Sequence, residues 1–113
     1  MDQLLKDYNE DTVHLVVKVI TKGSLTRLNE QELYSFVKYN RPYCFQFLKL
    51  SAKKKGFDNI FDMLSDSGLF DLDIVSIADA MYNSDSIHRK YVYSGIGLMI
   101  DRLVEEIVEK YKS

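Results

Sequence analysis

Apolar residues recur at intervals of three and four along most of the 113-residue chain, and short polar or glycine-containing breaks separate the runs. Such spacing is typical of amphipathic helices, whereas a half-buried strand would alternate apolar and polar residues. The breaks fall at residues 22–24, 40–42, 55–56, 67–68 and 83–85. The pattern therefore predicts an all-α fold, a compact bundle of about six helices with a long C-terminal helix. The short connections favour antiparallel packing of neighbouring helices. We expect a single helical domain over residues 1–113.

The first predicted helix is the most ambiguous element. Its apolar face would consist of Val13, Val16, Val17 and Ile20, and Gly23 is well placed to end it. The same stretch is rich in β-branched residues and also alternates as a strand would, at Val13, Leu15, Val17 and Val19. We favour the helix because the rest of the chain offers no clear partner strand.

Polar residues at the predicted helix starts fit N-caps. Asn29 and Glu32 are spaced as a capping box, and Pro42 suits the first turn of the next helix. Asp58 is expected to cap a fourth helix, and either Asp71 or Asp73 a fifth. The faces expected to be buried are Leu33, Phe36 and Val37 in the second helix, Cys44, Phe45, Leu48 and Ala52 in the third, Phe57, Ile60, Phe61 and Leu64 in the fourth, and Ile74, Ile77, Ala78 and Met81 in the fifth.

The last predicted helix is the longest and runs from about Ser86 to Lys112. Its apolar stripe is Tyr93, Ile96, Ile100, Leu103 and Ile107, and the residues expected on its polar side are Asp101, Arg102, Glu105, Glu106 and Glu109. Gly95 and Gly97 fall in its interior, although glycine costs about 1 kcal/mol relative to alanine there. We therefore expect another helix to approach closely at this point. A kink or a docking point for a partner is the alternative.

Composition is that of an ordinary soluble globular protein, with 46% hydrophobic and 28% charged residues. The single cysteine, Cys44, excludes an intramolecular disulfide and fits a reducing compartment such as the cytoplasm. The acidic N-terminal residues lack the apolar segment of a signal peptide. No apolar run approaches the ~18 residues of a membrane span. We expect a cytoplasmic protein that does not bind membranes.

The sequence contains no recognisable catalytic or metal-binding motif. His14, Cys44 and His88 are the candidate zinc ligands, and they are far apart without paired spacing. The chain contains no nucleophile elbow, phosphate-binding loop or dinucleotide fingerprint. We therefore expect a protein that is not an enzyme and uses no cofactor or metal.

Charge is distributed unevenly along the chain. Residues 1–56 contain 10 Lys/Arg and 6 Asp/Glu, a balance of +4, whereas residues 57–113 contain 5 and 11, a balance of −6. Residues 57–85 contain seven Asp and no Lys or Arg. In the predicted fourth helix, Asp58, Asp62 and Asp66 would share one face. A solvated face is the simpler interpretation, and a docking surface for a basic partner is the functional one.

The tyrosines are a second candidate set, because tyrosine buries much area at interfaces with few torsions. They are either interface residues or the rim of a small core: Tyr34, Tyr39, Tyr43, Tyr82, Tyr91 and Tyr93. Together with the acidic surface they give the predicted partner-binding set of Asp58, Asp62, Asp66, Asp71, Asp73 and Tyr82.

Residues 76–92 also fit a helix-turn-helix DNA-binding unit. Its first helix would use Ile77, Ala78 and Met81, its turn would be Tyr82-Asn83, and its second helix would begin at Ser84 or Asp85. The residues then expected to face DNA are Ser86, His88, Arg89 and Lys90, with Ile87 and Tyr91 packed inward. Four Asp against Arg89 and Lys90 give residues 71–90 a balance of −2, which opposes phosphate binding.

The favoured hypothesis is a small protein-protein interaction module that acts as an inhibitor or regulator, of the immunity type or a viral or phage accessory protein. Its partner would be a protein with a basic surface. The broad apolar face of the C-terminal helix also suits a homodimer seam. A helix-turn-helix transcriptional regulator is the alternative, and nucleic acid is the less favoured partner.

Overall fold

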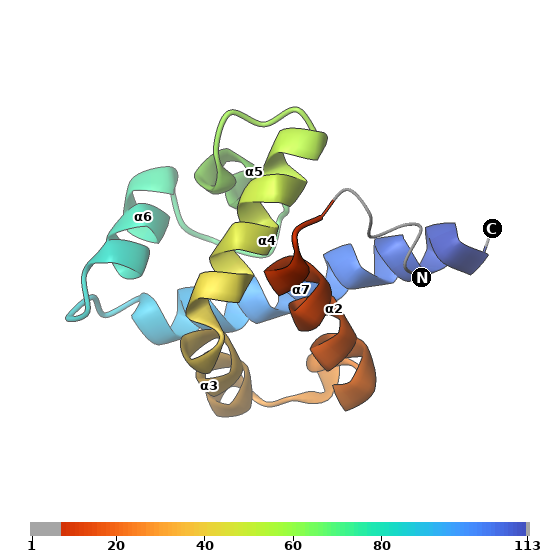
Figure 1. The fold of residues 1–113 in the computed structure, drawn as a ribbon. Helices are drawn as coiled ribbons and strands as arrows, with labels where there is room; N and C mark the ends of the chain where they lie inside the picture. Colours follow the sequence, from red (N-terminus) through yellow and green to blue (C-terminus); the bar gives the residue numbers. More distant parts are fainter. Residues whose placement is uncertain (1–7, 113) are drawn as a thin grey trace.

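The computed structural model describes residues 8–112, with side chains for residues 8–110, and the acidic stretch at residues 1–7 lies outside this range. Its elements are α2 (Glu10–Lys22), the 3-10 helix η1 (Leu25–Arg27), α3 (Glu30–Tyr39), α4 (Arg41–Lys54), α5 (Ile60–Asp66), α6 (Ile74–Tyr82) and α7 (Arg89–Lys112) (Figure 1). Six α-helices and no strand occur within the described range, which confirms the all-α bundle with a long C-terminal helix.

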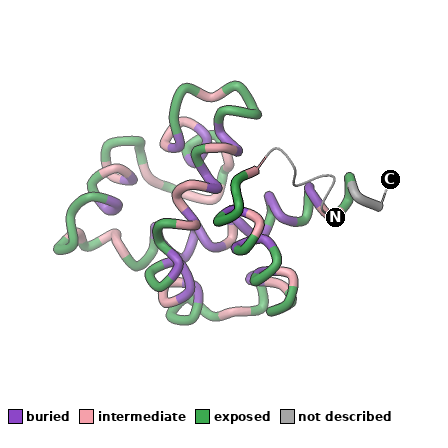
Figure 2. Tube along the Cα trace, viewed as in Figure 1, coloured by how far each residue is buried: buried purple, intermediate pink, exposed green. Residues whose placement is uncertain are grey.

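The longest helix, α7, is the element on which the others pack. α7 has 24 residues. Figure 1 shows it running behind α2 and α4, with α6 beside its N-terminal end. Every residue of the predicted stripe is buried, and Val92, Met99 and Val104 widen the buried face (Figure 2). α3 makes the most extensive contact with it. The apolar face of α7 as far as Ile107 is therefore occupied by the core of its own chain.

The ambiguous first element is a helix, because Asn9 caps its start and Gly23 ends it. The Asn9 side chain accepts from the Thr12 amide at 2.8 Å, and Gly23 has a φ of 103°. The alternative strand is thus wrong. The buried face also differs from the expected one: Val17 is 48% exposed, and the buried residues are Thr12, Leu15, Val16 and Val19.

Local capping signals place most of the other helix starts. The capping box of Asn29 and Glu32 is confirmed, and Pro42 lies in the first turn of α4. Asp73 caps α6, whereas the prediction that Asp58 caps the fourth helix is wrong. The Asn59 side chain accepts from the Asp62 amide at 3.0 Å and is the cap of α5. Asp58 therefore precedes the helix and does not share a helical face with the later aspartates.

The two glycines of α7 lie where other segments approach it closely, which confirms the expectation for Gly97. A Cβ built at Gly97 would lie 2.9 Å from Cδ2 of Leu33 in α3. A Cβ at Gly95 would overlap the ring of Phe70, which belongs to the connection between α5 and α6. The absence of side chains at these two positions lets α3 and this connection pack against α7.

The expectation that Asp101 lies on the polar side of α7 is wrong. Asp101 is 3% exposed, and its carboxylate accepts hydrogen bonds from the Leu25 amide and the Ser24 hydroxyl, both at 2.9 Å. A buried carboxylate needs such donors, because an unpaired one would be very costly. Asp101 thus fastens the start of η1 to the middle of α7.

Substitution of Asp101 by alanine tests this connection. The variant loses both acceptors and leaves the Leu25 amide without a partner, so we expect the free energy of unfolding to fall by about 2–4 kcal/mol. Urea denaturation followed by circular dichroism measures the change. Glu105→Ala, an exposed position one turn further along α7, is the control and should stay within about 0.5 kcal/mol. Equal losses in the two variants would contradict the role given to Asp101.

Candidate interaction surface

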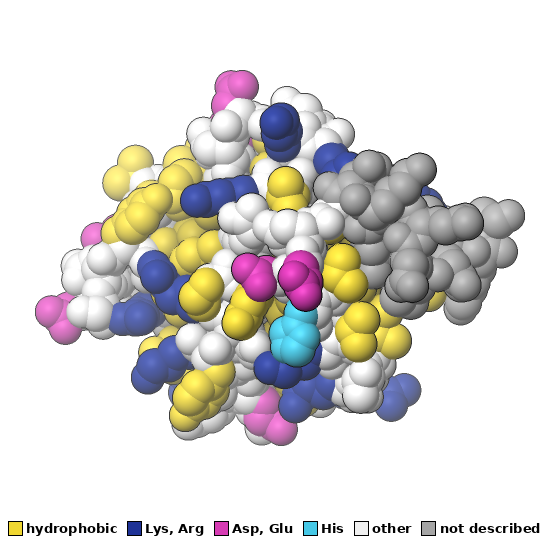
Figure 3. Space-filling view, viewed as in Figure 1, with side chains coloured by type: hydrophobic (Ala, Val, Ile, Leu, Met, Phe, Trp, Pro, Cys, Tyr) yellow, Lys and Arg dark blue, Asp and Glu magenta, His cyan; other side chains and the backbone are white. Residues whose placement is uncertain are grey.

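Exposed apolar side chains gather on and beside α6. We define the α6 surface as Ile74 (42% exposed), Val75 (76%), Tyr82 (77%) and Ile87 (90%). These are four of the seven large hydrophobic side chains that are exposed in the described part of the chain. Single exposed apolar residues are ordinary, whereas a group within residues 74–87 marks a candidate interface. Figure 3 shows hydrophobic side chains gathered at the upper left, over α6 and its neighbour α5.

The short helix α6 exposes apolar residues because it has them on both sides. Ile77, Ala80 and Met81 point into the core, while Val75 and Tyr82, two turns apart, share the outer side. The prediction that Ile74 belongs to the buried face is wrong, since it lies at the first position of the helix and is 42% exposed. Burying the outer side would require a partner.

Aspartates frame the α6 surface. Asp71 and Asp73 precede the helix, Asp79 lies on it, Asp85 follows it, and all four are exposed. The Asp73 carboxylate accepts from the Ser76 amide at 2.7 Å, and this backbone hydrogen bond lowers the pKa of Asp73 below its usual value. The lowered pKa keeps the Asp73 carboxylate charged at neutral pH.

A cleft of about 390 Å³ adjoins the α6 surface at Tyr82. Phe61 of α5 packs edge-on against Tyr82, with the ring centroids 5.9 Å apart. The cleft is lined by Lys49, Ala52, Lys53, Phe57, Asp58, Asn59, Ile60, Phe61 and Tyr82. Two residues of the predicted partner-binding set, Asp58 and Tyr82, are thus brought together.

The other predicted acidic residues are spread more widely. Asp62 is half-buried in the first turn of α5. Asp66, at its C-terminal end, borders a separate hollow that is also lined by Lys55 and Arg102. Asp58, Asp62 and Asp66 therefore do not form the continuous row that the sequence suggested, and the carboxylates nearest to exposed apolar residues are those around α6.

The six tyrosines differ in burial, and Tyr34 and Tyr43 fit the rim of the core that was one of the two expectations. Tyr93 is completely buried in the core, and Tyr34 and Tyr43 are half-buried. Tyr39, Tyr82 and Tyr91 are exposed. Of these three, Tyr82 lines the cleft described above. It is therefore our choice of aromatic interface residue.

The local geometry expected of a helix-turn-helix is not present at residues 82–91. α7 begins at Arg89, so Ser86 and His88 lie in the preceding turn and not on a second helix. Ile87 and Tyr91, expected to pack inward, are 90% and 43% exposed. The apolar side chain of Ile87 consequently points to solvent among the residues that were to face DNA.

Two arginines near this turn are engaged within the fold. The Arg89 guanidinium lies over the Tyr93 ring, 5.2 Å from its centroid. Arg41 donates from Nε to the Tyr93 hydroxyl at 3.0 Å and from Nη2 to the Met81 carbonyl at 3.3 Å. A cation at the C-terminal end of α6 also complements the helix dipole. Arg41 thus holds α4, α6 and α7 together, and Arg89 packs on a ring of its own helix, whereas Lys90 is exposed.

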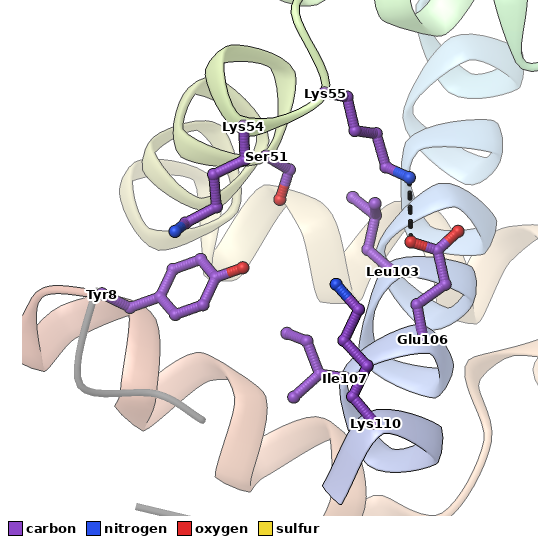
Figure 4. A pocket seen from close by; sticks show the side chains of 8 residues that line it. All are labelled: Tyr8, Ser51, Lys54, Lys55, Leu103, Glu106, Ile107 and Lys110. Atoms are coloured by element: carbon purple, nitrogen blue, oxygen red, sulfur yellow. Dashed lines mark ion pairs between the residues drawn. The ribbon is translucent and has the colours of Figure 1, made fainter. Parts of the chain in front are cut away.

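A smaller cavity of about 110 Å³ lies between α4 and the C-terminal half of α7 (Figure 4). Lys55 and Glu106 form an ion pair of 2.9 Å across it. Lys54 Nζ lies 5.0 Å from the centroid of the Tyr8 ring. Because Lys55 and Glu106 are both partly exposed, their pair contributes at most about 1 kcal/mol. We assign these groups to the packing of α4 against α7.

The positions of the candidate metal ligands and of the Cys44 thiol limit the reactions in which these groups can take part. Within the described residues, no three His, Cys, Asp or Glu side chains are grouped so as to hold a metal ion. Cys44 is completely buried, and burial raises the pKa of its thiol to about 12. This is the opposite of the lowered pKa that activates a catalytic thiol. None of the helices described is both long and apolar enough to traverse a bilayer.

Sequence reasoning missed several residues of this site. Val75 was not assigned to any surface, and Phe57 and Phe61 were assigned to the core. The available signal was the density of apolar residues in α6, since six of its nine residues are Ile, Val, Ala or Met on more than one side of the helix. Lys49 and Lys53 carried no signal, because their place beside the cleft depends on how α4 packs.

No protein-family model, no curated protein and no solved structure matches the chain. The function therefore has to be inferred from the surface of this chain itself.

The burial of Cys44 predicts slow reaction with thiol reagents. At about pH 8 we expect Ellman's reagent to modify the native protein only through opening of the fold, and the denatured protein at once. Burial raises the pKa of the Cys44 thiol from 9.0 to about 12, so the neutral thiol favours the folded state below pH 9. Relative to Cys44→Ala, the wild type should lose stability as pH rises above 9. Rapid stoichiometric labelling of the native protein would contradict this.

Proposed function

We propose that the protein is a non-enzymatic interaction module, an inhibitor or regulator that binds a protein partner through the α6 surface. The observation that carries the proposal is the group of exposed apolar side chains within residues 74–87. Protein interfaces typically have a few apolar or aromatic anchors at the centre and a polar rim. Val75 and Tyr82 supply such anchors, and the surrounding aspartates supply the rim.

The charge of the rim defines the partner. Residues 57–85 contain seven Asp and no Lys or Arg, so a partner with an apolar centre flanked by Lys or Arg is complementary. A second copy of this chain suits the surface less well, because a two-fold contact would bring the same aspartates face to face. Small inhibitors, immunity factors and viral or phage accessory proteins act in this way, and the buried single thiol fits the cytoplasm.

A charge introduced at Val75 tests the proposal. Val75→Asp places a carboxylate at the centre of the proposed interface, so we expect affinity for the partner to fall by about 2 kcal/mol, or about thirtyfold. The measurement compares tagged wild type with the variant, first by capture from nuclease-treated lysate and then by calorimetry with the purified partner. Val17→Asp, which changes an exposed valine on α2, is the matched control and should bind as the wild type does.

The outcomes separate the proposal from its alternatives. Equal retention of the partner by the Val75 and Val17 variants would overturn the α6 surface as the interface. Formation of a homodimer that Val75→Asp abolishes would replace the foreign partner by a second copy. A parallel capture without nuclease tests the other alternative, because nucleic acid that the wild type recovers and Arg89→Ala loses would favour the transcriptional regulator.

A further inference from the structure

The cleft beside Tyr82 differs from the α6 surface in both shape and charge. It is a hollow of about 390 Å³, bounded by the C-terminal half of α4, the start of α5 and the end of α6. This volume lies within the usual range of ligand-binding clefts. Its apolar walls include Phe57, Phe61 and Tyr82. Its volume is therefore large enough for a side chain from a partner, whereas the outer side of α6 is a convex helix surface.

Two lysines on α4 form one edge of the cleft. Lys49 and Lys53 are one helical turn apart and exposed, and neither forms an ion pair or hydrogen bond with the described part of the chain. Asp58 is the only carboxylate among the lining residues, so the cleft has a balance of +1. In Figure 3, dark blue side chains lie beside the hydrophobic group over α6. The lining of the cleft is thus positive on balance, whereas residues 71–85 contain four Asp and no Lys or Arg.

We propose that the cleft is an anchor pocket for an apolar side chain of the partner, aromatic or leucine-sized, with a carboxylate next to it in the bound segment. The inference rests on the proposed function, because the segment belongs to the same partner. The anchor lies against Phe57, Phe61 and Tyr82, and the carboxylate pairs with Lys49 and Lys53. Since the α6 surface favours basic residues, the two charged regions also fix the direction in which the segment lies.

The pocket is tested with defined peptides and does not require the partner to be known. The probes are the capped tripeptide Glu-Phe-Glu and its neutral counterpart Gln-Phe-Gln, each titrated into ¹⁵N-labelled protein and followed by NMR. We expect Glu-Phe-Glu to shift the amide signals around Phe57, Phe61 and Tyr82. Two partly exposed ion pairs should make Gln-Phe-Gln bind about fivefold more weakly.

The lysines are tested with a matched pair of double variants. Lys49→Gln with Lys53→Gln should weaken Glu-Phe-Glu about fivefold and leave Gln-Phe-Gln unchanged. Lys22→Gln with Lys38→Gln, which removes the same net charge from exposed positions outside the cleft, should leave both titrations unchanged. Equal affinity for the two peptides, shifts centred elsewhere, or equal effects of the two double variants would each overturn the pocket.

The pocket and the proposed function can fail separately. Val75→Asp should bind Glu-Phe-Glu as the wild type does, because Val75 does not line the cleft. If Val75→Asp loses the partner while the Lys49 and Lys53 double variant keeps full affinity, the pocket is wrong and the α6 surface stands. If the peptide binds as expected while Val75→Asp keeps the partner, the cleft is an anchor site and the α6 surface is wrong.

Discussion

The fold depends on the burial of one long helix. α7 buries residues on a face wider than a single stripe, from Val92 to Ile107. α2, α3, α4, α6 and η1 cover it, and α5 packs on α4 and α6. Close approach is possible because α7 has no side chain at Gly97, where Leu33 of α3 lies against it. α7 is also linked to η1, because the Asp101 carboxylate accepts a hydrogen bond from the Leu25 amide. Burial of apolar side chains, the close approach at Gly97 and the buried Asp101 carboxylate thus all fix the position of α7.

The sequence alone was sufficient to predict features that depend on residues close together in the chain. The capping box at Asn29 and the stripe of α7 follow from spacing alone, because both are set within one or two turns of helix. It was insufficient where a distant segment decides the environment. Asp101 has the polar identity of its neighbours on α7, and only the position of η1, more than seventy residues earlier, makes it a buried acceptor. Ile74 was misplaced because it lies at the first position of α6, where it is 42% exposed.

The candidate site was predicted in part. The aspartates of residues 57–85 and Tyr82 are present around it, but Asp58 does not lie on the helix of Asp62 and Asp66, because Asn59, one residue after Asp58, caps α5. Exposed apolar residues on α6 and lysines on α4 meet at Tyr82 only through tertiary packing. An alternating pattern of charge around an apolar centre favours selective binding over tight non-specific association, since a wrong partner would place like charges together.

The position of α7 in the chain has a consequence for synthesis. The apolar faces of α3 and α6 pack mainly on a helix that is translated after both of them. On the ribosome these helices emerge without the core that will cover them, so chaperones have a period in which apolar surface is accessible. Contacts such as that between Leu25 and Asp101 span most of the chain. Closing such a long loop is slow relative to the formation of a helix. The chain therefore folds chiefly after translation of α7, as one cooperative event.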